Sequence, residues 1–167
     1  MTDPRRAPVR AWYIATPTLA TAATLTVTLH IAIHWTRHHA GVHLLDFQLT
    51  GDSARALLTD LANVPGATDT HFWITAALDT PYALAYGALV AGLCARYAPS
   101  RPALYAAAAF LGAACDLAEN ALHILALTGT ADLLSLKPLF TPTKFALIAP
   151  ASALATWLWA RSVFGRA

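Results

Sequence analysis

Residues 103–127 read ALYAAAAFLGAACDLAENALHILAL, an apolar run that is interrupted by Asp116, Glu119, Asn120 and His123. A helix that crosses a membrane needs about 20 mostly apolar residues, and this run is long enough. The four polar side chains follow one another at i, i+3, i+4 and i+7, so they share one face of a helix. The stretch therefore predicts a membrane-spanning helix with a single polar face.

The composition of the whole chain agrees with a membrane protein. Of the 167 residues 57% are hydrophobic and only 12% are charged, whereas a soluble domain carries about 25% charged residues. The high apolar content also excludes a disordered chain. A formal net charge of +2 with scattered arginines provides no basic stripe for nucleic acid.

Four stretches qualify as spans, at residues 11–35, 72–95, 103–127 and 140–160. We expect an all-α fold, a four-helix bundle that forms a single membrane domain over residues 1–167. Seven arginines lie on the side of the termini, against Arg37, Arg55 and Lys137 on the other side. Because basic residues are in excess in cytoplasmic loops, both termini are predicted to be cytoplasmic.

The first outer loop, at residues 36–71, contains a further predicted helix. Asp52 or Ser53 is the expected N-cap, and an apolar stripe follows at i, i+3, i+4 and i+7, formed by Ala54, Leu57, Leu58 and Leu61. We expect this short amphipathic helix to lie on the membrane surface or across the outer mouth of the bundle. Further apolar anchors are expected at Leu44, Leu45 and Phe47.

Charged side chains inside the spans mark a candidate site. Asp79, Asp116, Glu119 and Lys144 would each cost roughly 2.5 to 3.5 kcal/mol at the bilayer centre. Other polar side chains in the spans are His30, His34, Tyr82, Tyr86, Asn120, His123 and Thr141. Helix geometry places the group in the outer half of the bundle, above an inner half packed through small residues such as Gly87, Gly92, Ala108 and Gly112. The pattern predicts an outward-facing polar pocket and disfavours a conducting pore.

The charges of this pocket do not balance. Three carboxylates and one ammonium leave a formal excess of two negative charges, which a low dielectric does not tolerate. Carboxyl groups must stay protonated, histidines must take protons, or a cation must bind. Asp116 lies deepest and is predicted to be the neutral acid, whereas Asp79, at the depth of Lys144, is predicted to be the carboxylate.

The sequence resembles an uncharacterised family of small four-span bacterial membrane proteins. The resemblance is carried by Leu45-Asp46-Phe47-Gln48, Ser53-Ala54-Arg55, Leu78-Asp79, Tyr86-Gly87, the run Asp116-Leu117-Ala118-Glu119-Asn120 and Thr143-Lys144. These pieces extend from residue 43 to residue 144. The resemblance implies a location in the bacterial cytoplasmic membrane and one constellation of polar residues, and it implies no activity.

Our first hypothesis for function is a membrane-embedded enzyme that performs acid–base chemistry on a small lipophilic substrate, such as an isoprenoid or a membrane lipid. Cyclisation, isomerisation and hydrolysis all fit. The expected general acid is Asp116 or Glu119, and Asp79 is the base or charge stabiliser. Substrate contacts are expected from Asn120, Lys144, Tyr82, Tyr86 and His123.

Two other hypotheses stay open. One is a module or transporter subunit that binds a cation, a proton or haem, in which His30 or His34 and His123 would ligate iron. In the same hypothesis a divalent metal would be held by Asp116, Glu119, His123 and Asp79. The other hypothesis is a structural subunit, in which an Asp–Lys pair serves assembly alone. No cofactor is predicted, and the expected partners are the membrane and a lipophilic molecule, not nucleic acid.

Overall fold

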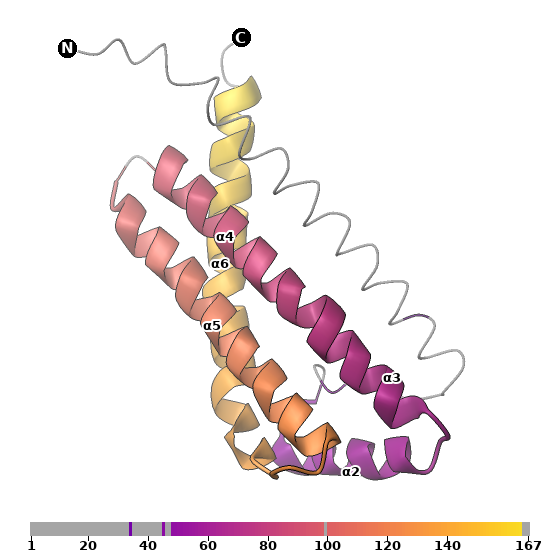
Figure 1. The fold of residues 1–167 in the computed structure, drawn as a ribbon. Helices are drawn as coiled ribbons and strands as arrows, with labels where there is room; N and C mark the ends of the chain where they lie inside the picture. The colour runs from indigo at the N-terminus through magenta and orange to yellow at the C-terminus, as the bar shows by residue number, and fades with distance from the viewer. Residues whose placement is uncertain (1–33, 35–44, 46–47, 99, 165–167) are drawn as a thin grey trace, which may run out of the picture.

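The computed structural model describes residues 34, 45, 48–98 and 100–164, and all secondary structure in this part of the chain is helical (Figure 1). Four helices form the described fold. The elements in chain order are α2 (Gly51–Ala62), α3 (Ala67–Trp73), the π-helix η3 (Ile74–Asp79), α4 (Thr80–Tyr97), α5 (Pro102–Leu127), the 3-10 turn η4 (Leu134–Leu136) and α6 (Lys137–Phe164). Since α3, η3 and α4 follow one another without a break, they form one long helix.

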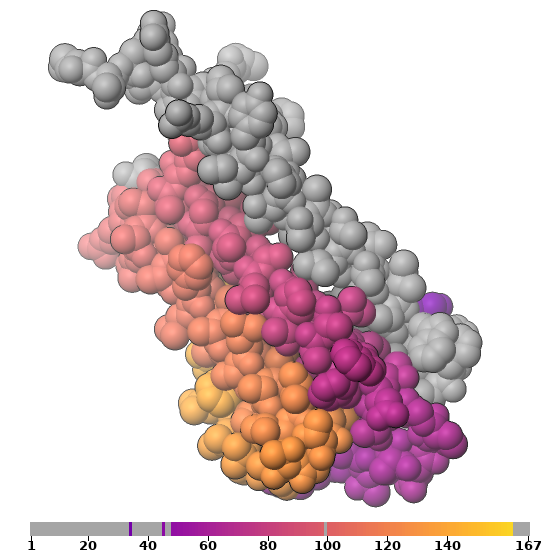
Figure 2. Space-filling view, in the orientation of Figure 1, coloured from indigo at the N-terminus to yellow at the C-terminus, as the bar shows by residue number. Residues whose placement is uncertain are grey.

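Helix α2 lies across one end of the bundle (Figure 1). Its N-cap is Thr50, which forms a capping box with Ser53, so the prediction of a cap at Asp52 or Ser53 was wrong by two to three residues. The buried face consists of Gly51, Ala54, Leu57 and Leu61, and Leu58 is half-buried beside it. Figure 2 shows α2 beside the α5–α6 connection at this end of the molecule.

An apolar cluster holds α2 against the bundle. Its other buried members are Leu45, Ala67, Leu122 and Leu134, which come from four different parts of the chain. Leu45 is an anchor that the sequence predicted, whereas Leu44 and Phe47 lie outside the described residues. A helix of 12 residues is marginal alone in water, so this packing is what holds α2 in place.

The long helix from α3 to α4 has one buried face, which is polar near α2 and consists of small and apolar residues further along. His71, Thr75 and Asp79 are buried near α2, and Ala83, Gly87, Val90, Ala91 and Cys94 are buried further along. The π-helix η3 lies in the polar half, and Thr80 donates its backbone N–H to the carbonyl of Thr75 within it. The predicted span at 72–95 therefore lies inside a longer helix, Ala67–Tyr97.

Helices α5 and α6 form the other two walls. Helix α5 begins at Pro102, as the proline predicts, and the residue before it, Arg101, has a φ of 50°. Helix α6 begins at Lys137, three residues before the predicted span at 140–160, and has Pro142 and Pro150 inside it. This earlier start matters for the site, because it places Lys137 in the bundle and not in a loop.

Small residues bring the helices close together in the half away from α2. A Cβ atom built on Gly87 would lie 2.5 Å from Cβ of Ala113, and one built on Gly112 would lie 2.6 Å from Cγ1 of Ile148. Both glycines therefore permit contacts that no larger residue allows. Nothing among the described residues lies within 4 Å of a Cβ built on Gly92, so its predicted packing role stays a prediction.

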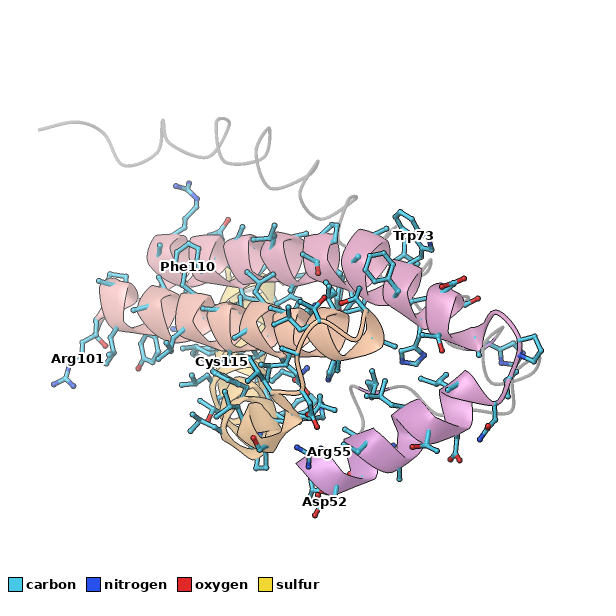
Figure 3. The ribbon with its side chains drawn as sticks, turned by 60° about the horizontal axis from the view of Figure 1, so that its bottom comes forward. Asp52, Arg55, Trp73, Arg101, Phe110 and Cys115 are labelled. Carbon is cyan, nitrogen blue, oxygen red and sulfur yellow. The ribbon has the colours of Figure 1, made fainter. Side chains whose placement is uncertain are left out.

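Two of the described helices, Ala67–Tyr97 and Pro102–Leu127, are long and apolar enough to cross a membrane. Large apolar side chains on them are more than half exposed, among them Trp73, Leu84, Leu104, Phe110 and Leu111. Figure 3 shows Trp73 and Phe110 on the outside of the bundle. The buried interior beside them holds carboxylates, ammonium groups and histidines. Apolar side chains on the outside and a polar cluster in the interior are what a membrane-spanning bundle would show, although the interior also holds two apolar clusters.

Candidate functional site

Both lysines of the chain and its one glutamate meet in a single cluster between α5 and α6. We call the six residues Asp116, Glu119, His123, Lys137, Thr141 and Lys144 the α5–α6 cluster; all of them are buried. Its members are spaced alike on the two antiparallel helices, by three and four residues, so each side chain on α5 lies opposite one on α6. Side chains of α5 therefore contact side chains of α6 along the whole length of the cluster.

Glu119 is the centre of the α5–α6 cluster. Its Oε1 atom is ion-paired with Lys137 Nζ and accepts a hydrogen bond of 2.6 Å from Thr141 Oγ1. Its Oε2 atom lies 2.7 Å from Lys144 Nζ. The side chain has no exposed surface, so three donors replace the water that a carboxylate would otherwise bind.

Asp116 is the second bridging carboxylate. Its Oδ1 accepts a hydrogen bond of 2.6 Å from Lys144 Nζ, and its Oδ2 accepts one of 2.6 Å from the hydroxyl of Tyr86 on α4. Asp116 therefore connects α6 to α4. Asp116 thus contacts two donors and Glu119 three, and both carboxylates share Lys144.

This geometry corrects the predicted partner of Lys144. The depth argument made Lys144 the partner of Asp79 and kept Asp116 as a neutral acid, but the structure places the Lys144 ammonium between Asp116 and Glu119. The reason is that α6 begins at Lys137, so Lys144 lies two turns inside the helix rather than one. The Lys144 ammonium nitrogen lies 2.6 Å from Asp116 Oδ1.

Lys137 is the residue that the sequence reasoning missed, since it was counted as a basic residue of an outer loop. The structure buries it completely, in contact with Glu119 and with His123 Nε2 at 3.0 Å. Its signal was the spacing, because Lys137, Thr141 and Lys144 mirror the acidic stripe on α5. With Lys137 included, the formal excess of the buried carboxylates over ammonium groups falls from two charges to one.

The polar face of η3 and α4 lies beside the cluster. Asp79 is buried there and interacts electrostatically with Tyr86. Asn120 is buried on α5, and its Nδ2 donates to Thr80 Oγ1 at 3.5 Å, whereas its Oδ1 has no hydrogen-bond partner among the described residues. Thus the predicted residues Asp79, Asp116, Glu119, Asn120, His123 and Lys144 occupy the same half of the bundle.

A second buried histidine was also missed by the sequence reasoning. His71 on α3 has no exposed surface, and its Nε2 accepts a hydrogen bond of 3.1 Å from the backbone N–H of Leu45. It connects the long helix to the segment before α2. Its position four residues before Thr75 and eight before Asp79 was a readable signal, because all three share the buried face.

A cavity of about 230 Å³ opens between α4 and α6. It is lined by Tyr82, Tyr86, Lys144, Phe145, Ile148 and Ser152. The rings of Tyr82 and Tyr86 pack edge to face at 5.2 Å and form one wall. Tyr86 and Lys144 connect this largely apolar cavity to the buried carboxylates behind it.

The part of the chain that the structure describes contains no group of side chains arranged to bind haem iron or a divalent metal. No three His, Cys, Asp or Glu side chains are grouped there in a way that could hold a metal ion. His34 is exposed, and His30 lies outside the described residues. The Nε2 atom of His123, which an iron would need, lies 3.0 Å from an ammonium nitrogen.

Outside the bundle, an ion-pair latch holds α2 to the α5–α6 connection. Arg55 Nε lies 2.6 Å from Asp132 Oδ2, and a second guanidinium nitrogen lies 3.0 Å from Asp52 (Figure 3). The hydrogen bond from Arg55 lowers the pKa of Asp132, and the backbone N–H of Leu134 adds to the effect. The Arg55–Asp132 latch thus closes the end of the bundle that holds Lys137 and His123.

Comparison with protein-family models, with curated proteins and with solved structures finds no match to this chain.

Proposed function

We propose that this protein is a membrane-embedded enzyme that transfers protons to and from a small lipophilic molecule. One observation supports this proposal above the others. The apolar cavity between α4 and α6 is joined, through the Tyr86 hydroxyl and the Lys144 ammonium, to a buried carboxylate, Asp116. A cavity of this kind binds an apolar molecule, and a few convergent polar groups then act on it.

In this proposal Tyr86 is the group that touches the substrate. Its hydroxyl gives its proton to a carbon or oxygen of the bound molecule, and the O–H bond breaks as the new bond forms. The Lys144 ammonium, close to Asp116, stabilises the negative charge that is left behind. Asp116 then takes a proton from Lys144 and passes it to Tyr86, so the residue that the sequence predicts as the acid acts one step behind the cavity.

The cavity limits what the substrate can be. At about 230 Å³ it is smaller than the usual range of roughly 300 to 1,000 Å³ for sites that enclose a whole drug-sized ligand. A long lipid would therefore place only its reactive end inside. The rest would lie along the exposed apolar surface near Phe145, which is 51% exposed.

The charges favour this function over cation binding. The argument for a cation rested on an excess of two negative charges, and the buried Lys137 removes one of them. In addition, Asp116 and Glu119 each already contact an ammonium group.

We further propose that the chain crosses the bacterial cytoplasmic membrane four times, at residues 11–35 and through the three long helices, with both termini in the cytoplasm. The outward-facing apolar side chains and the arginine distribution support this topology. Reporter fusions at the C-terminus and after Gly51 are expected to report opposite sides of the membrane. A cytoplasmic signal from both fusions would refute the topology.

A deuterium experiment tests the proposed chemistry without a known substrate. The protein in lipid nanodiscs is incubated in D₂O with a total bacterial lipid extract, and the extract is searched by mass spectrometry for lipids that gain deuterium or change mass. We expect such a change with the wild type, and a loss of at least about 100-fold in its rate with Tyr86→Phe and Asp116→Asn.

The matched control is Tyr105→Phe, which removes the same hydroxyl from a half-buried tyrosine at the other end of the bundle. It should leave the rate unchanged. A second variant, Ile148→Trp, fills the cavity and should prevent the reaction, whereas Ala149→Trp on the exposed face of α6 should not. No protein-dependent change in the extract, or a change that survives in Tyr86→Phe and Asp116→Asn, would refute the proposal.

A further inference from the structure

We propose that Lys137 and His123 form the supply end of a proton relay that serves the cavity, an inference that rests on the proposed function. The two ends of the relay lie in different places. Tyr86 lines the cavity, whereas Lys137 and His123 have no exposed surface and lie toward the end that α2 covers. The substrate and the proton source are thus kept apart.

Every link of the relay is a hydrogen bond or an ion pair. His123 Nε2 lies 3.0 Å from Lys137 Nζ, which is ion-paired with Glu119 Oε1. Glu119 Oε2 lies 2.7 Å from Lys144 Nζ, and this nitrogen lies 2.6 Å from Asp116 Oδ1. The other oxygen of Asp116 accepts the hydrogen bond of the cavity tyrosine. Chains of this kind let a proton move by short steps along existing hydrogen bonds.

A cationic contact for each carboxylate does not by itself require Lys137. Lys144 alone contacts both Asp116 and Glu119, so each carboxylate would keep a cationic partner without Lys137. Burial of an ammonium group costs several kcal/mol before its contacts offset that cost. A second buried lysine is understandable if it delivers protons.

The steps conserve protons and charge. After Tyr86 has given up its proton, Asp116 takes one from Lys144 on Oδ1, the carboxyl group turns over, and the same proton passes to the Tyr86 oxygen. Glu119 then passes a proton in the same way from Lys137, bound at Oε1, to Lys144, bound at Oε2. The net result of one cycle is the movement of one proton from water at the α2 end to the substrate.

His123 is placed to recharge Lys137. The charged and titratable groups that face it are Lys137 on α6, Glu119 on its own helix, Lys144 and, from α3, His71. An imidazole can accept a proton on one nitrogen and release one from the other. The apolar cluster between α2 and the bundle covers the end at which His123 lies. In this proposal water reaches His123 only when α2 opens locally.

The chain offers an unusually direct test, because Lys137 and Lys144 are its only lysines. Labelling with ¹⁵N-lysine gives two side-chain signals by NMR for the full chain in nanodiscs, and Lys144→Arg assigns them. The exchange of the ammonium protons with water is then measured for each lysine. In His123→Gln an acceptor for Lys137 remains, but the side chain cannot pass a proton on.

The relay predicts that His123→Gln slows the exchange of the Lys137 ammonium by at least about tenfold. A fold that is merely loosened would speed this exchange, since opening exposes buried protons to water. The control His71→Gln changes a histidine at the same end and keeps an acceptor for Leu45, and it should not slow the exchange. An equal or faster exchange in His123→Gln would overturn the relay.

A second measurement separates the relay from the proposed enzyme. In the deuterium experiment, His123→Gln should complete the first turnover at the wild-type rate and then slow, and added imidazole should restore later turnovers. If the wild type has no activity while its exchange behaves as expected, the enzyme is refuted and the proton path is not. If the wild type is active and His123→Gln changes neither exchange nor turnover, the relay alone is refuted.

Discussion

The substitution Glu119→Gln tests whether the α5–α6 cluster stabilises the fold as a connected unit. Gln keeps the shape of the side chain but removes the negative charge that contacts Lys137 and Lys144. Two ammonium groups would then face one carboxylate, Asp116, in a buried space. Breaking a buried pair in this way costs about 3 to 5 kcal/mol. We expect a loss of that size in the free energy of unfolding.

A double substitution makes this prediction more specific. Lys137→Met alone leaves two carboxylates with one ammonium, whereas Lys137→Met combined with Glu119→Gln leaves the balanced pair Lys144 and Asp116. The double variant should therefore lose less stability than the sum of the two single losses, by about 1 to 3 kcal/mol. Non-additivity of this sign requires that the two residues share one charge balance.

Equilibrium unfolding with SDS in mixed detergent micelles, followed by far-UV circular dichroism, measures these free energies. The control is Asp132→Asn, which removes a carboxylate from an exposed ion pair that solvent screens, and its effect should be much smaller. Strict additivity of the two buried substitutions would contradict the reasoning. So would a loss in Glu119→Gln no greater than that in the control.

Three further predictions concern helix packing at Gly87, the Arg55–Asp132 latch and the lining of the cavity between α4 and α6. Gly87→Ala should lower stability by about 1 to 3 kcal/mol because its new Cβ would lie 2.5 Å from Ala113 Cβ, whereas Gly92→Ala should not, and the same SDS unfolding compares them. The pKa of Asp132 is lowered in the fold, so the stability that its ion pair with Arg55 gives to α2 is present above the ordinary pKa of an aspartate and is lost as pH falls through the lowered value. Amide hydrogen exchange of α2, corrected for its intrinsic pH dependence, should therefore become faster at low pH in the wild type. The same change should be absent in Asp132→Asn. Ser152→Leu should narrow the cavity and weaken retention of a co-purifying lipophilic molecule in mass spectrometry of the gently extracted protein, and equal retention would contradict the assignment of the cavity as the binding site.

The sequence predicts much of the fold because the strongest signals are local. The apolar run at 103–127 and the proline at 102 predict α5 to within a residue, and the stripe from Ala54 to Leu61 predicts the buried face of α2. The cap at Thr50 was missed because three adjacent residues, Thr50, Asp52 and Ser53, all have capping side chains. Two of the three long described helices, Ala67–Tyr97 and Pro102–Leu127, pass the length and hydropathy test for a span, and α6 is not among them. The predicted span at 11–35 lies outside the described residues.

The site is predicted less completely, since its contacts are not local. The stripe on α5 shows which carboxylates share a face, but only the start of α6 decides which lysine lies opposite which carboxylate. Moving that start from residue 140 to Lys137 brings a second ammonium into the bundle and shifts the partner of Lys144 from Asp79 to Asp116 and Glu119. The position of a helix start is thus the quantity that the sequence determines least well and the site depends on most.

The π-helix η3 keeps the two halves of the long helix in rotational register. The buried residues of the long helix recur at every fourth position from His71 to Gly87. Four residues of an α-helix turn through about 400°, so in a regular α-helix the buried face would rotate by about 40° at each step. The wider turn of η3 compensates part of this drift, because each of its turns holds more residues. Deleting one residue within Ile74–Asp79 would therefore rotate His71 by about 100° relative to Gly87 and turn it away from the interior. In evolutionary terms, η3 has the form of a one-residue insertion whose removal would turn a buried histidine out of the interior of the bundle.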